Sequence, residues 1–148
     1  MGLARQVAAG FAVLAALLLA ACAGDSPEAR LRVRLDALQQ SIEAREGGRI
    51  AHYLAADFIG PGAMDREGAV RMARGAFLRY RAVGVTVVGP ADVEMQGEGR
   101  ARVRFEAALT GGSGAVLPEA ARLWSVETGW RVEDGEWRMV SAAWEPRL

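Results

Sequence analysis

The hydrophobic period of this chain changes at Gly84, and this change limits the fold more than any other feature. Before Gly84, apolar residues recur every three or four positions, beginning with Leu31 and Leu35, as on one face of an amphipathic helix. After Gly84, apolar and polar residues alternate, most regularly over residues 100–109, as in a half-buried strand. A run of helices followed by a run of strands predicts an α+β domain.

Three helices are expected in the first part of the domain. Ser26 and Asp65 each precede a helical stretch and have the short polar side chains that cap a helix N-terminus. Gly47-Gly48 is expected to end the first helix. The expected elements are a helix from Pro27 to the glycine pair, a short helix over residues 49–56, a loop over residues 57–63 and a helix from Asp65 to near Arg81.

Four strands are expected after the helices. They are predicted over residues 85–95, with a bulge or bend at Gly89-Pro90, and over residues 100–109, 122–133 and 136–145. Asp134-Gly135 favours a two-residue hairpin turn between the last two strands. The residues between the second and third strands, 110–120, are rich in glycine and are expected to form a loop.

The last hairpin carries a family resemblance. Its sequence, Gly129-Trp130-Arg-Val-Glu-Asp-Gly-Glu-Trp137-Arg-Met-Val, together with the order of the elements, resembles the nuclear transport factor 2-like (NTF2-like) superfamily, and in particular its bacterial SnoaL-like branch. The resemblance covers residues 27–146 and implies an NTF2-like domain over residues 27–148. This domain would be a cone in which three N-terminal helices pack on a bent antiparallel sheet around a central cavity. Because the superfamily includes enzymes, transport adaptors and ligand-binding proteins, the fold leaves the activity open.

The first 22 residues resemble a bacterial lipoprotein signal. Arg5 supplies the positively charged n-region of a signal peptide, and an apolar run follows it. Leu19-Ala20-Ala21-Cys22 then resembles a lipobox that ends in the chain's single cysteine. We therefore expect a signal peptide over residues 1–21, acylated Cys22 as the membrane anchor, and a short tether over residues 22–26. Since Ala23 follows Cys22 and is not acidic, we expect anchoring in the outer membrane with the domain facing the periplasm.

Composition excludes several classes of partner. The chain has 18 basic and 18 acidic residues, so no positive excess exists for binding nucleic acid. It has one histidine and one cysteine, and its carboxylates lack the spacing of a calcium loop, so no metal is expected. The glycine-rich stretch near Ser113 has no lysine and no following helix, so it is not a phosphate cradle. We therefore expect no cofactor.

Asp57 and His52 are the candidates for acid or base catalysis. His52 is the only imidazole, and Asp57 could fix its tautomer. The plainer interpretation of His52 is a residue on a helix surface or end. The resemblance to the ketosteroid isomerase branch places that branch's proton-shuttling acid near Gly60, three positions after Asp57, which counts against isomerase chemistry.

Large aromatic residues are candidates for a ligand pocket, although in a small domain they more often form the core. The residues that we select as ligand-binding are Tyr53, Tyr80 and Trp130. The resemblance also implies that the outer face of the sheet, with its row of Arg100, Arg102 and Arg104, is where two copies of the chain would form a homodimer.

Three hypotheses about function follow. The first is an outer-membrane lipoprotein that binds a small apolar ligand, or an envelope protein partner, without catalysis. The second is a SnoaL-like enzyme of the isomerase, dehydratase or hydrolase type that uses Asp57 or His52. The third is an assembly factor of the envelope that uses the outer face of the sheet and has no functional cavity.

Overall fold

A computed structural model describes residues 24–112 and 120–147. Cys22, the expected signal peptide and most of the expected loop over residues 110–120 lie outside these residues. Within the described part of the chain, no helix combines the length and the apolar character needed to cross a membrane.

The helices begin where their caps predict. Helix α2 (Pro27–Glu43) starts after Ser26, whose hydroxyl accepts a hydrogen bond of 3.1 Å from the amide of Ala29. Helix α4 (Arg66–Arg79) starts after Asp65, whose carboxylate accepts one of 2.7 Å from the amide of Gly68. Each cap satisfies an amide that has no partner inside its helix. Between α2 and α4 lie one turn of α-helix, α3 (Gly47–Ile50), and one 3₁₀ turn, η1 (Ala51–Tyr53).

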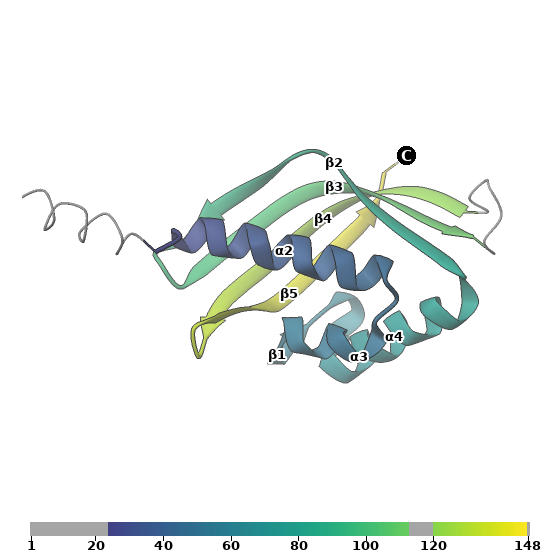
Figure 1. Cartoon of the computed structure of the whole chain (residues 1–148), viewed down its shortest axis with the longest axis horizontal. Coiled ribbons are helices and arrows are strands. Elements are labelled where there is room, and N and C mark those ends of the chain that lie inside the picture. Colours follow the sequence, from purple (N-terminus) through teal and green to yellow (C-terminus); the bar gives the residue numbers. More distant parts are fainter. Residues whose placement is uncertain (1–23, 113–119, 148) are drawn as a thin grey trace, which may run out of the picture.

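Five strands form one curled sheet in the order β1-β5-β4-β3-β2 (Figure 1). Their bounds are β1 Leu54–Ile59, β2 Ala82–Met95, β3 Arg100–Gly112, β4 Ala120–Glu133 and β5 Glu136–Pro146. The pairs from β2 to β5 are antiparallel, as predicted, and the expected irregularity in β2 lies between Val88 and Asp92. Asp134 and Gly135 have φ angles of 50° and 80°, which are the positive values that a tight hairpin turn of this kind requires.

Strand β1 corrects the prediction for residues 54–59. These residues were expected to end a helix and begin a loop, but they form a strand that pairs in parallel with β5. The sequence Leu-Ala-Ala-Asp-Phe-Ile has no strict alternation of apolar and polar residues, so the usual signal of a half-buried strand is absent. Its partner lies at the far end of the chain, and no local pattern reveals a parallel pairing of this kind.

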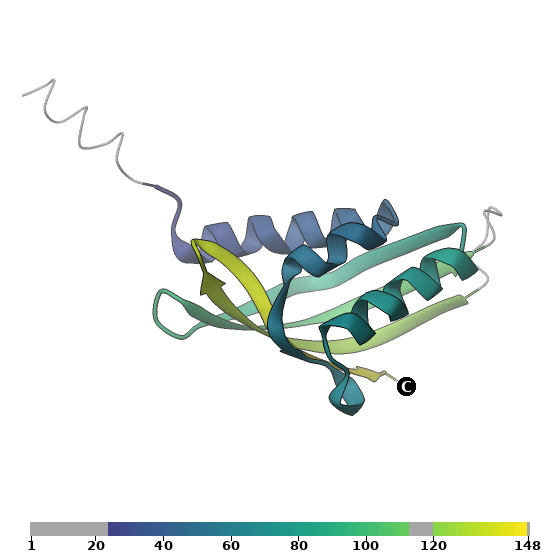
Figure 2. The ribbon, with the colours of Figure 1, turned by 90° about the horizontal axis from the view of Figure 1, so that it is seen from below.

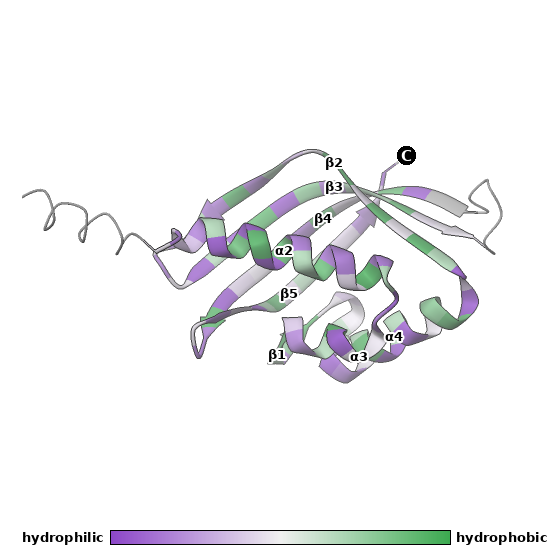
Figure 3. Cartoon of the chain, in the orientation of Figure 1, coloured by the Kyte–Doolittle hydropathy of each residue, from purple (hydrophilic) through white to green (hydrophobic). Residues whose placement is uncertain are grey.

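All the helices lie on one side of the sheet (Figures 1 and 2). Helix α2 packs against β2 and β5, and α4 packs against β1. Figure 3 shows hydrophilic and hydrophobic bands alternating along the strands, as expected of a sheet with one covered face. This arrangement confirms the predicted α+β cone of helices on a bent sheet.

The core is organised around Trp130 on β4. Its side chain is 1% exposed, and its indole N–H donates a hydrogen bond of 2.8 Å to the hydroxyl of Thr128. The Thr128 hydroxyl lies 3.5 Å from the carbonyl oxygen of Val103, to which it donates. The threonine thus gives the buried indole an acceptor, and a buried N–H group without a partner is costly.

We expect the substitution Thr128→Val to lower the free energy of unfolding by about 1–3 kcal/mol, because it keeps the shape of the side chain but leaves the Trp130 N–H without its acceptor. Urea unfolding of both proteins measures this difference. Thr86→Val, at an exposed position on β2, is the control and should change stability little. Equal stability of the Thr128→Val and wild-type proteins would contradict the role given to this hydrogen bond.

Candidate functional site

A groove of about 380 Å³ lies between α2 and the inner face of the sheet. Its walls are apolar on both sides, and most of their side chains are only half-buried. The apolar residues of the lining are Leu35, Leu38 and Ile42 from α2, Val85, Val87 and Ala91 from β2, Phe105 from β3 and Met139 from β5.

Polar contacts attach α2 to the sheet along the groove. At its N-terminal end, the indole N–H of Trp137 donates to the carbonyl of Pro27 at 3.1 Å. Near the middle, Arg34 donates through Nε to the carbonyl of Trp137 at 3.1 Å. Further along, Gln39 donates to the carbonyl of Val85 at 2.7 Å. These contacts fix the helix over the sheet while its apolar residues remain partly uncovered.

The polar groups of the groove lie on the α2 side or are already engaged. Arg32 forms an ion pair with Glu28 at 2.7 Å, and both side chains are largely exposed. Asp36 is exposed on the same helix, and Thr128 uses its hydroxyl within the core. The interior of the groove therefore offers apolar contact, while charge is confined to its edge.

The three aromatic residues predicted to bind a ligand do not line this groove. Tyr53 is 6% exposed, its hydroxyl donates to the carbonyl of Ala37 at 3.1 Å, and the Arg34 guanidinium stacks 4.4 Å from the ring centre. Trp130 is buried in the core. The ring of Tyr80 packs so closely on Gly111 that an added Cβ there would lie 3.0 Å from it. The structure thus places the three aromatic side chains apart from the groove, each in contact with other parts of the protein.

Sequence reasoning missed the residues that do line the groove. The helical period that begins with Leu31 and Leu35 predicts one apolar face for this helix, and that face, which also carries Leu38 and Ile42, points at the sheet. The distance between the helix and the sheet, which no local pattern sets, leaves this face partly open. The one hint in the sequence is that the apolar face of the helix and the strand residues Val85 and Val87 all carry aliphatic side chains of moderate size.

His52 and Asp57 also lie away from the groove. The His52 side chain is exposed, while its backbone carbonyl accepts hydrogen bonds of 2.7 Å from both Arg34 and Arg138. The Asp57 side chain is 65% exposed and forms an ion pair of 2.9 Å with Arg131. Within residues 24–112 and 120–147, no hydrogen bond joins His52 to Asp57.

The electrostatics of Asp57 suit a structural ion pair. Hydrogen bonds from Arg131 hold the pKa of the Asp57 carboxyl below its ordinary value, because they stabilise the charged form. Arg131 also contacts Glu133, and both carboxylates raise the pKa of its guanidinium. A carboxylate of lowered pKa is a weak base at neutral pH, whereas catalytic bases usually have a pKa near the working pH. The pair instead connects β1 to β4 across β5.

The outer face of the sheet carries the expected arginine row as part of an ion-pair ladder. Arg104 lies 2.8 Å from Glu127 on β4, and this contact lowers the pKa of that carboxyl. Arg102 lies 3.7 Å from the same glutamate and from Glu94 on β2. These exposed pairs balance charge across the face, and each adds little stability. Elsewhere, no group of three or more possible metal ligands occurs in the part of the chain that the structure describes.

We expect Asp57→Asn to lower the free energy of unfolding slightly at about pH 7, because Arg131 loses a charged partner. The pKa of Asp57 is lower in the folded than in the unfolded chain, so its contribution is present above the ordinary value of 3.8 and is lost as the pH falls through the folded-state pKa. The stability difference should therefore disappear in acid. Urea unfolding over a pH series measures it, with Glu98→Gln, at an exposed turn residue, as control.

A difference between the Asp57→Asn and wild-type proteins that stays constant down to about pH 2 would show that the carboxylate charge is not its cause.

Comparisons with known proteins find the fold but no close relative. No family model and no curated protein sequence matches this chain. Among solved structures, a candidate scytalone dehydratase from Novosphingobium aromaticivorans is 12% identical, with a TM-score of 0.72 over 80% of this chain and 83% of that one. A candidate dehydratase of the NTF2-like family from Streptomyces avermitilis is 15% identical, with a TM-score of 0.66 over 80% and 94% of the two chains.

A hexachlorocyclohexane dehydrochlorinase, LinA-type3, from Novosphingobium barchaimii is 12% identical, with a TM-score of 0.66 over 82% of this chain and 86% of that one. At such low identities the likeness concerns architecture, and function does not follow from it. The chain thus has the NTF2-like fold, a curled sheet of five strands whose inner face is covered by helices.

Proposed function

We propose that this domain is a binding module that holds a small apolar molecule in the groove under α2. The observation that carries the proposal is the groove itself, with about 380 Å³ of space between apolar walls. Ligand pockets typically have volumes of about 300–1,000 Å³, mostly apolar linings and a few polar groups. Covering roughly 200 Å² of apolar surface contributes on the order of 5 kcal/mol before the costs of association.

The position of the ionisable groups favours binding without catalysis. Structural neighbours are named as dehydratases and a dehydrochlorinase, and chemistry of that kind in this chain would need an acid or base in the groove. Asp57 lies outside it in an ion pair with Arg131, and His52 is exposed on η1. Arg32 and Asp36 at the edge of the groove can instead orient a polar end of the ligand.

The anchor belongs to the same proposal. We propose that Cys22 is acylated and holds the domain at the periplasmic side of the outer membrane. Only residues 23–26 separate this cysteine from α2, so the tether reaches at most about 18 Å even when fully extended. The domain would therefore work close to the bilayer, where apolar molecules of the envelope are concentrated and where an envelope protein partner could meet it.

Filling the groove should abolish ligand binding. We expect native mass spectrometry of the mature chain carrying Cys22→Ser, purified gently from the periplasm, to show a retained small molecule. The additional substitution Ala91→Trp puts a large side chain into the groove and should remove it. Ala143→Trp is the matched control, because Ala143 is exposed on β5 and does not line the groove.

A molecule retained equally by the Ala91→Trp protein would place the ligand elsewhere. If no molecule is retained and none of a panel of apolar probes binds, the proposed ligand site is wrong, and crosslinking in the envelope would then test for a protein partner.

Removing the cysteine should release the protein. We expect wild type in the outer-membrane fraction, labelled by radioactive palmitate, and Cys22→Ser in the soluble periplasmic fraction, because two or more acyl chains are needed for a stable anchor. Ala23→Ser keeps the cysteine and serves as the control. Ala23→Asp should shift the protein to the inner membrane on a sucrose gradient. A Cys22→Ser protein that stays membrane-bound without label would show that the anchor assignment is wrong.

A further inference from the structure

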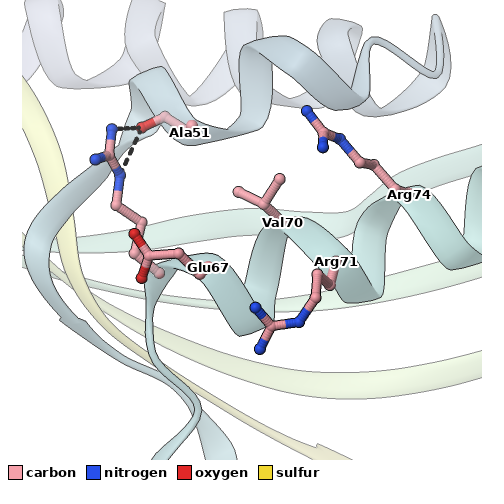
Figure 4. A pocket seen from close by; sticks show the side chains of 6 residues that line it. Ala51, Glu67, Val70, Arg71 and Arg74 are labelled. Carbon is pink, nitrogen blue, oxygen red and sulfur yellow. Dashed lines mark hydrogen bonds between the residues drawn. The ribbon is translucent and has the colours of Figure 1, made fainter.

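A second groove, of about 310 Å³, lies between η1 and α4 (Figure 4). Val70 of α4 and Ala51 of η1 form its apolar part. Its other lining residues are Arg66, Glu67, Arg71 and Arg74, all on α4. It shares no lining residue with the groove under α2, so the inference drawn from it does not depend on the proposed function.

Two of the arginines are held in place. Arg66 donates to the carbonyl of Ala51 through Nε at 3.2 Å and Nη2 at 2.8 Å. The stem of Arg74 packs on Gly47, so closely that a Cβ at Gly47 would lie 2.9 Å from its Cγ. In Figure 4 the guanidinium group of Arg74 lies beside Val70. Side chains that are already held in place lose less conformational freedom when a ligand binds, so part of the entropic cost of binding is already met.

The positive charge of this groove is not balanced. Among the described residues, no carboxylate oxygen lies within 4.0 Å of a side-chain nitrogen of Arg66, Arg71 or Arg74. The lining has Glu67 as its one acidic residue. On the outer face of the sheet, by contrast, Arg102 and Arg104 are both paired with carboxylates. In a chain whose formal net charge is zero, this region of α4 therefore attracts anions.

We propose that the groove binds an amphiphilic anion, with a phosphate or carboxylate head on an apolar stem. The planar guanidinium fork of Arg74 suits the paired oxygens of such a head, and Arg71, whose guanidinium lies on the other side of Val70 in Figure 4, adds positive charge to the groove. Val70, Ala51 and the methylene stem of Arg74 offer apolar contact to the stem of the ligand. A free amphiphile and the headgroup region of an anionic lipid both present this chemistry.

The experiment uses octyl phosphate, below its micelle concentration, as the probe for the mature chain carrying Cys22→Ser. Isothermal titration gives the affinity, and amide chemical shifts locate the site. The double substitution Arg71→Gln/Arg74→Gln should weaken binding at least fivefold, and amides near Ala51 and Val70 should shift. The control Arg30→Gln/Arg100→Gln removes the same charge at exposed positions on α2 and β3 and should leave the affinity unchanged.

Three results would overturn the proposal: unchanged affinity in the double variant, equal weakening by the control pair, or shifts confined to Leu38, Val87 and Phe105 in the other groove. Equal affinity for inorganic phosphate or for octan-1-ol would show that the ligand class is wrong. Binding to phosphatidylglycerol vesicles distinguishes an anionic lipid from a free amphiphile. If the protein binds octyl phosphate and also binds these vesicles in a way that depends on Arg71 and Arg74, the ligand is a lipid surface. If it binds octyl phosphate alone, the ligand is a free amphiphile.

Discussion

The attachment of α2 to the sheet is the constraint on which the rest of the domain depends. Trp137 binds the carbonyl of Pro27, Arg34 binds the carbonyl of Trp137, and Gln39 binds that of Val85. Hydrogen bonds of this kind fix a distance and a direction, whereas apolar packing alone would bring a helix as close to a sheet as its side chains allow. The groove under α2 is the space that these contacts leave open.

The same arrangement separates the apolar and charged surfaces of the domain. The inner face of the sheet meets α2 through apolar side chains, while Arg102, Arg104 and Asp57 form ion pairs outside the groove. Charges that stay largely in water lose little hydration, and the ion pairs that they form are weak. Among the described residues, Arg66, Arg71 and Arg74 of α4 form no ion pair, and they line a groove with an apolar part. The domain thus offers two surfaces with different ligand chemistry.

Local sequence signals were reliable at two helix N-termini and at the last hairpin turn, but not at Gly47-Gly48, which begins α3 and does not end α2. Ser26 and Asp65 cap their helices, and Asp134-Gly135 makes the turn, because each of these features is set within a few residues. The signal failed for β1, whose pairing depends on β5 at the far end of the chain. The ion pair of Asp57 with Arg131 was likewise beyond the reach of local patterns, because the position of Asp57 follows from that pairing. The aromatic candidates do not line the groove, since Tyr53 and Trp130 form hydrogen bonds inside the protein.

The sequence by itself determined the capped N-termini of α2 and α4, the antiparallel strands from β2 to β5, the last hairpin turn and the class of the fold, because periodicity, capping and turn chemistry are local properties of the chain. It also carries the lipobox-like segment that ends at Cys22, which lies outside the described residues. The tertiary structure alone decided that β1 joins the sheet, that Asp57 meets Arg131, and that Leu35, Leu38 and Ile42 line a groove. These features depend on contacts between distant segments, whose spacing is set when the whole chain packs.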